Sequence, residues 1–237
     1  MEGQFSHSAE IGGSTTIRAG NDVKTTRTWA SFLAAAFLLS ALGAGADAQT
    51  TTICPQLQTI FDAPGHVDAV MSAAKQSTTW LKHGCSTASF SRLARLKIWR
   101  ALAFDQAGEP TAGAWQETIH VDGCGFTRNL NVLTVVRARQ EMLSIVLAPG
   151  ETRGDPTLQR DAATYVFAAV AARVPGCKDA YVDDTQVEPD RSRLPSLNPE
   201  KPGWGEEWTV VACGRPVVVV LTFTPDATGT TISAHAK

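Results

Sequence analysis

An internal duplication constrains the fold of this chain more than any other feature. Two stretches, at 115–125 and 204–214, share the skeleton Trp-x-Glu-x-x-x-Val-x-x-Cys-Gly with identical spacing. A Gly-Cys pair precedes each stretch, at 84–85 and at 176–177. Self-similarity at a fixed spacing is the signature of a repeated structural unit. The sequence therefore predicts that one ancestral unit was copied and that both copies fold alike.

The segment 24–48 has the three parts of a secretory signal peptide. Basic residues precede an apolar, uncharged run at 28–45, and a small-x-small cleavage site, Ala-Asp-Ala, follows at 46–48. The apolar run is short for a membrane span of about 20 residues, so a retained anchor is the weaker alternative. We expect a periplasmic or secreted protein, with 1–23 as a disordered N-terminal extension.

Charge and length limit the classes of partner. The whole chain has 21 basic and 23 acidic residues, and removal of 1–48 takes away three basic and four acidic ones, which leaves a formal charge of −1. Such a near-neutral surface argues against nucleic acid, which requires a basic face. No second apolar run of membrane length follows, so no membrane span is expected in the mature chain. We expect no cofactor, and a partner among envelope proteins or cell-wall components.

All five cysteines lie in the predicted mature chain, where an oxidising compartment allows disulfides to persist. The repeat favours Cys85 with Cys124 and Cys177 with Cys213, which leaves Cys54 outside. Each bridge would stabilise the fold by roughly 3–4 kcal/mol in the chain-entropy treatment. The alternative pairing joins equivalent cysteines of the two copies. A metal site is disfavoured because the chain has no Cys-x-x-Cys pair.

Two segments have the pattern of helices, one in each copy. Residues 66–82 place apolar side chains at helical spacing, and Gly84 provides the left-handed stop; His66 is expected to be exposed. Residues 157–173 contain neither glycine nor proline. They follow Asp155, a suitable N-cap, and a proline at the first helical position.

Alternation of polar and apolar residues predicts the strands, although 90–104 is ambiguous between strand and helix. Each copy then reads as one helix plus an antiparallel meander of three or four strands, an α+β fold with a tandem pseudo-repeat. The predicted divisions are a lead-in strap at 49–64, a first α+β unit at 65–150 and a second at 151–237. The predicted strands are 90–104, 116–122, 129–136, 142–148, 180–187, 206–212, 216–223 and 228–233.

One triplet, His120-x-Asp122-x-Cys124, has catalytic potential. Alternate strand residues share a face about 7 Å apart, and imidazole and carboxylate are the usual partners of an activated thiol. The second copy has Thr209 and Val211 at the matching positions, so its cysteine lacks this chemistry. We therefore interpret Cys124 as structural. The alternative is an envelope hydrolase or thiol enzyme that uses His120, Asp122 and a free cysteine.

The repeated Trp-x-Glu pairs are the candidate ligand-binding residues: Trp115 with Glu117, and Trp204 with Glu206. Two aromatic–acid pairs suit a sugar, a peptide or a cationic group. Packing of the tryptophans in the core is the favoured interpretation, because aromatic burial dominates core energetics. The sequence contains no Gly-x-Ser-x-Gly, His-Glu-x-x-His or phosphate-loop motif. It therefore favours a binding or assembly module over an enzyme.

Overall fold

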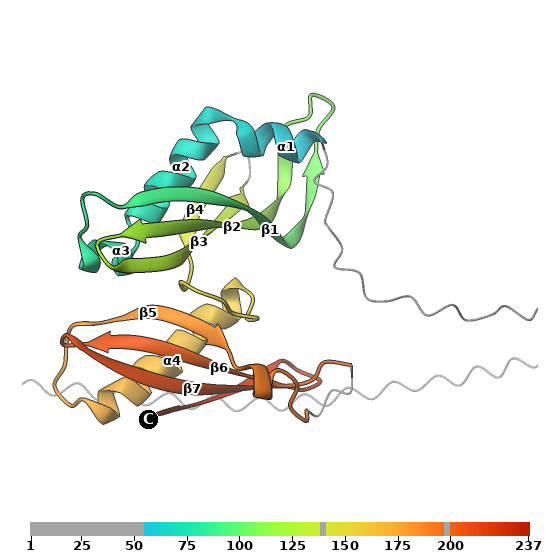
Figure 1. The fold of residues 1–237 in the computed structure, drawn as a ribbon. Helices are drawn as coiled ribbons and strands as arrows, with labels where there is room; N and C mark the ends of the chain where they lie inside the picture. Colours follow the sequence, from blue (N-terminus) through green and yellow to red (C-terminus); the bar gives the residue numbers. More distant parts are fainter. Residues whose placement is uncertain (1–54, 138–140, 197–199) are drawn as a thin grey trace, which may run out of the picture. The chain divides into compact units, whose positions relative to one another are not determined.

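Two four-stranded antiparallel sheets, each flanked by helix, make up the described part of the chain. The computed structural model describes residues 55–137, 141–196 and 200–237. Both sheets are meanders, with strand orders β1-β2-β3-β4 and β5-β6-β7-β8 (Figure 1). The fold is therefore α+β. The predicted extension 1–23 and signal peptide 24–48, together with Cys54, lie outside the described residues.

Three short helices precede the first sheet. Two of them lie where the sequence predicted one continuous helix over 66–82, and the first lies within the segment 49–64 that was predicted as a lead-in strap. The break occurs at Ser77, whose hydroxyl accepts a hydrogen bond from the Trp80 backbone N–H at 3.2 Å and so caps a new helix. Gly84, with a φ of 56°, closes that helix as predicted. The helices are α1 (Pro55–Asp62), α2 (Pro64–Lys75) and α3 (Thr78–His83).

The first sheet contains a long and irregular edge strand. β1 confirms the strand assignment of the ambiguous segment 90–104. Between Arg92 and Leu96 the register against β2 shifts, since the paired β2 residues are Ile119 and Glu117. Extra residues in one strand of a pair form bulges, which disturb strict alternation. This explains the ambiguous sequence pattern. The strands are β1 (Ser89–Phe104), β2 (Pro110–Gly123), β3 (Phe126–Val136) and β4 (Met142–Val146).

The second half begins with one long helix that follows its local sequence signals. Asp155 caps α4 through its carboxylate, which accepts from the Leu158 backbone N–H at 2.8 Å. The strands cover the segments predicted for them, with ends that differ by a few residues. The elements are α4 (Pro156–Arg173), β5 (Ala180–Val187), the 3₁₀ helix η2 (Pro189–Arg191), β6 (Trp204–Ala212), β7 (Arg215–Pro225) and β8 (Thr230–Ala236).

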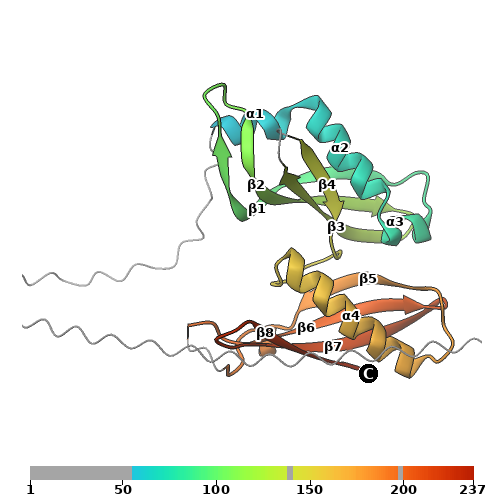
Figure 2. The same ribbon diagram turned by 180° about the vertical axis from the view of Figure 1, so that it is seen from behind.

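Each sheet packs one face against its own helix (Figure 2). In the first half, Val70 of α2 is buried with residues of β2 and β3. In the second half, α4 buries Ala162, Val166 and Val170 against a group that includes Trp208. Each fully buried valine contributes roughly 1.5–3 kcal/mol, so these layers provide the core. Among the described helices none combines the length and the apolar character needed to cross a membrane.

Candidate functional site

Both disulfides lie at the end of a β-hairpin. The structure joins Cys85 to Cys124 and Cys177 to Cys213, with Cα–Cα distances of 6.1 and 5.9 Å, as the repeat predicted. The second cysteine of each bridge begins a two-residue loop, with φ of 52° at Cys124 and 49° at Cys213. The glycine that follows each also has positive φ, which is the pattern of a type I′ turn. Each bridge thus fixes a cysteine in a backbone region that L-residues avoid.

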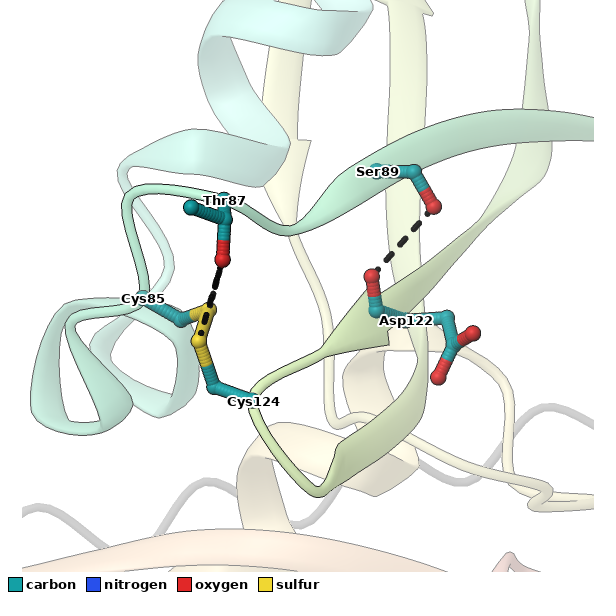
Figure 3. Close-up of a disulfide and its surroundings, with 5 residues drawn as sticks. All are labelled: Cys85, Thr87, Ser89, Asp122 and Cys124. Atoms are coloured by element: carbon teal, nitrogen blue, oxygen red, sulfur yellow. Dashed lines mark hydrogen bonds between the residues drawn. A yellow bond between two sulfur atoms is a disulfide. The ribbon is translucent and has the colours of Figure 1, made fainter.

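Cys124 is bonded to Cys85 in the first disulfide rather than to the other members of its predicted triplet. The Thr87 hydroxyl lies 3.3 Å from the Cys124 sulfur, and the Asp122 side chain points away from the disulfide (Figure 3). The Asp122 carboxylate instead accepts from the Thr127 hydroxyl at 2.8 Å. A sulfur held in a disulfide is not a thiolate nucleophile. In this oxidised state the triplet therefore does not form an activated thiol.

His120 lies on the opposite face of β2 from the core and lines an open cavity of about 590 Å³. Its Nδ1 is 3.0 Å from the Asn129 side-chain oxygen, so Nε2 is the ring nitrogen left for a ligand. Arg95 and Asp184 also line this cavity. The structure thus places His120 in a polar recess, beside basic and acidic side chains.

Glu117 is completely buried and is surrounded by donors. His66 Nε2 lies 2.5 Å and Trp115 Nε1 3.1 Å from its Oε1. Arg92 donates twice to Oε2, at 3.0 and 2.6 Å. Burial raises the pKa of the Glu117 carboxyl, but the hydrogen bond and charge of His66 and the charge of Arg92 outweigh it and lower the pKa. The carboxylate is therefore held in its charged form.

Arg92 is held in place on both sides. Its guanidinium lies over the Phe61 ring, 3.6 Å from the ring centroid, while it pairs with Glu117.

The expectation that His66 is exposed was wrong, because His66 is buried against the Glu117 carboxylate. Sequence reasoning identified Trp115 and Glu117 but missed these two basic partners. They come from α2 and from a bulged part of β1, and no local pattern marks them.

Glu206 is equally buried but has a different set of partners. Its Oε1 accepts from Trp204 Nε1 at 2.8 Å and, at 2.9 Å each, from the Thr152 hydroxyl and the Arg153 backbone N–H. Its Oε2 accepts from Trp208 Nε1 at 2.9 Å. All four donors are neutral. Within the described residues the Glu206 carboxylate forms no ion pair, so hydrogen bonds alone satisfy it.

A lysine of β1 lies close to this second carboxylate. Lys97 Nζ donates to the Thr152 carbonyl at 3.3 Å and lies 3.8 Å from the Trp99 ring centroid. Burial lowers the pKa of Lys97, while the negative charges of Glu206, Asp155 and Glu151 act in the opposite direction. The Lys97 contact brings β1 against the segment that precedes α4.

A third buried acid, Asp183 of β5, joins the two halves of the chain. His83 Nε2 of α3 lies 2.8 Å from its Oδ1, and Arg128 of β3 donates to its Oδ2 at 2.6 Å. Asp183 is buried, whereas exposed ion pairs add little to stability. A partly buried cluster like this one holds α3, β3 and β5 in a defined contact.

Trp99 and Trp204 line one cavity of about 620 Å³, which we call the tryptophan cavity. Trp204 is half-buried, whereas Trp115 of the first sheet is fully buried. Of the four predicted ligand-binding residues, Trp204 is therefore the one that lines this cavity. The other residues that define the cavity are Arg153, Asp155, Leu158, Lys201 and the turn 225–230.

Together these features define a disulfide-stabilised α+β protein with two buried tryptophan–carboxylate clusters. In the part of the chain that the structure describes, no group of three or more His, Cys, Asp or Glu side chains is arranged to hold a metal ion. Comparison of the chain with protein-family models, with curated proteins and with solved structures finds no match.

Proposed function

We propose that this chain is an exported, disulfide-stabilised binding or assembly module rather than an enzyme. The observation that carries the proposal is the state of its reactive side chains. Both cysteine pairs that the repeat predicted are oxidised. His120 and Asp122, which would have to assist a thiol, are bonded to Asn129 and Thr127 instead. The surface features that remain available to a binding partner are therefore the cavities lined by polar and aromatic side chains.

We further propose that the module arose by duplication of one α+β unit. Glu117 pairs with Val132 across β2 and β3, six residues before Gly123 ends its strand. Glu206 pairs with Leu221 across β6 and β7, at the same distance from the end of its strand. An equal register on both hairpins supports descent from one unit. The three helices before the first sheet, against one before the second, are then a later divergence.

The proposed location is the periplasm or the exterior of the cell. Disulfides persist in these oxidising compartments and are rare in the cytosol. The proposed partner is an envelope protein or a cell-wall component, since the near-neutral charge gives no attraction to nucleic acid. Under this proposal the mature chain begins at Gln49.

Export is tested by expressing the full chain and separating cytoplasmic, periplasmic and secreted fractions. N-terminal sequencing of the exported form is expected to begin at residue 49. Thiol labelling under denaturing, non-reducing conditions is expected to leave Cys85, Cys124, Cys177 and Cys213 unmodified. A full-length product confined to the cytoplasm, with all these cysteines labelled, would refute the proposal. Reduced Cys85 and Cys124 in the exported form would instead favour the thiol enzyme.

Binding is tested by capture from envelope extract with immobilised wild-type protein. Trp204→Ala is expected to lose partners, because Trp204 is the repeat tryptophan that lines a cavity. Tyr165→Ala is the matched control, since Tyr165 is an exposed aromatic on α4 outside that cavity. Equal partner sets for wild type and Trp204→Ala would show that binding does not use this site.

A further inference from the structure

The tryptophan cavity brings together two indole rings that the surrounding structure holds rigidly. Trp204 stacks on Phe223 with ring centroids 4.8 Å apart and an interplanar angle of 10°. Its Nε1 is bonded to the buried Glu206. One face and the polar edge of Trp204 are therefore occupied, and this fixed indole lines the cavity.

Trp99 is fixed in a similar manner from the opposite half of the chain. Its Nε1 donates to the Gln116 side-chain oxygen at 3.1 Å, and Lys97 covers one face of its ring. Neither indole has to be immobilised when a ligand binds. Immobilisation of a side chain on binding costs free energy, so a preformed aromatic surface binds more strongly.

Polar groups of both charges surround the two rings. Arg153 and Lys201 supply donors, and Asp155 and Asp226 supply acceptors, so the formal charges of the lining balance. Asp155 uses Oδ1 to cap α4, which leaves Oδ2 for a ligand. The Arg153 guanidinium bonds to the Ser192 carbonyl through one nitrogen, Nη1, and retains other N–H donors.

We infer that the tryptophan cavity binds a neutral oligosaccharide, of the kind that a cell-wall glycan presents. This inference rests on the proposed role as an exported binding module. A sugar ring has an apolar C–H face that packs on an indole, and hydroxyls at its rim that both donate and accept. Fixed aromatic faces with a few oriented polar groups match that pattern, and the volume lies in the usual range for ligand sites.

The balanced charge separates this ligand from the other candidates. A polyanion needs an excess of donors, and a basic peptide needs an excess of carboxylates; a lining of two cations and two anions favours neither. A neutral sugar gains hydrogen bonds from both kinds of group. The charge of the cavity therefore selects the neutral glycan.

The test is calorimetric titration of the purified chain with chitohexaose and cellohexaose as neutral probes. Hexagalacturonate and hexalysine serve as anionic and cationic probes. We expect at least one neutral hexaose to bind saturably. Trp99→Ala, which removes one ring, should weaken that binding by about tenfold or more, as loss of a single stacking contact does.

A second variant fills the cavity without removing any contact. Ala227 lies exposed in the turn that lines the cavity, so Ala227→Trp should block it and weaken binding similarly. Tyr165→Ala should bind like wild type. Absence of saturable binding of both neutral hexaoses up to about 10 mM, or unchanged binding in both cavity variants, or binding of a charged probe alone, would overturn the inference.

These outcomes are separable from those of the proposed function. The titration uses purified protein and does not depend on where the cell places it. If the hexaoses fail to bind while wild type still captures envelope partners, the glycan assignment is wrong and the binding module stands.

Discussion

Trp208 and Glu206 lie two residues apart on the same face of β6, and the Trp208 indole nitrogen donates to the Glu206 carboxylate across 2.9 Å. With Trp204 on the other carboxylate oxygen, two indoles share one buried acid. In the first sheet one indole, that of Trp115, donates to Glu117, and the other partners of that carboxylate are His66 and Arg92. The indole–carboxylate bond therefore occurs in both Trp-x-Glu motifs, while the remaining donors differ between them.

Glu206→Ala should destabilise the protein by roughly 3 kcal/mol or more, because it leaves several buried donors without an acceptor. Urea unfolding measures this change. Glu207→Ala is the matched control, since Glu207 is the next residue on the opposite face and is partly exposed, with Lys237 as its ion-pair partner and Glu188 as a hydrogen-bond partner. Its cost should stay below about 1 kcal/mol. Equal costs at the two positions would show that the Glu206 cluster does not stabilise the fold.

Arg92→Ala should cost roughly 3–5 kcal/mol of unfolding free energy, because it removes a charged partner from the buried Glu117. Arg95→Ala, three residues along the same strand, changes an exposed arginine and should stay within about 0.5 kcal/mol. The same urea titration compares them. An Arg92→Ala variant as stable as Arg95→Ala would contradict the ion pair.

Stability should fall in mild acid because of Glu117. The pKa of this carboxyl is lowered in the folded chain relative to its ordinary value of 4.5, so the unfolded chain takes up a proton first as the pH falls. The contribution of Glu117 is complete above about pH 4.5 and is lost as the pH falls through the lower folded pKa. Urea midpoints measured from neutral to acidic pH should therefore fall more steeply for wild type than for Glu117→Gln. Parallel curves would argue against a lowered pKa.

The second cysteine of each disulfide should tolerate glycine better than alanine. Loss of the Cys177–Cys213 bridge is expected to cost roughly 3–4 kcal/mol in either case. Cys213 has a φ of 49°, a region that glycine adopts freely and alanine does not. The variant Cys177→Ala/Cys213→Gly should therefore be more stable than Cys177→Ala/Cys213→Ala by about 1 kcal/mol. The reverse order in thermal unfolding would contradict the left-handed turn.

Elements whose sequences carry strong local signals agree closely with the predictions made from the sequence. α4 begins at Pro156 after its Asp155 cap, because those residues determine a helix start by themselves. The helix over 66–82 was wrongly taken as continuous, since Ser77 acts as a cap inside an otherwise helical pattern. β1 was ambiguous because its bulges break the alternation on which a strand assignment depends.

The disulfide partners and the Trp–Glu pairs could be read from the repeat, because identical spacing carries long-range information. The basic residues around Glu117 could not. His66 lies 51 residues before Glu117 in the chain, and a lone histidine gives no sign of the acid that it will meet. Such a contact depends on how α2 packs on the sheet, which no local pattern encodes.

The irregular course of β1 also affects the tendency of this protein to associate through the edge of its first sheet at high concentration. β1 is one of the two edge strands of its sheet and one of the longest elements in the described chain. A straight outer strand of that length would offer an unbroken row of amide and carbonyl groups to a neighbouring molecule. Four register shifts interrupt that row, and the strand contains several arginine and lysine residues. The protein can thus keep a long outer strand and still resist intermolecular sheet growth.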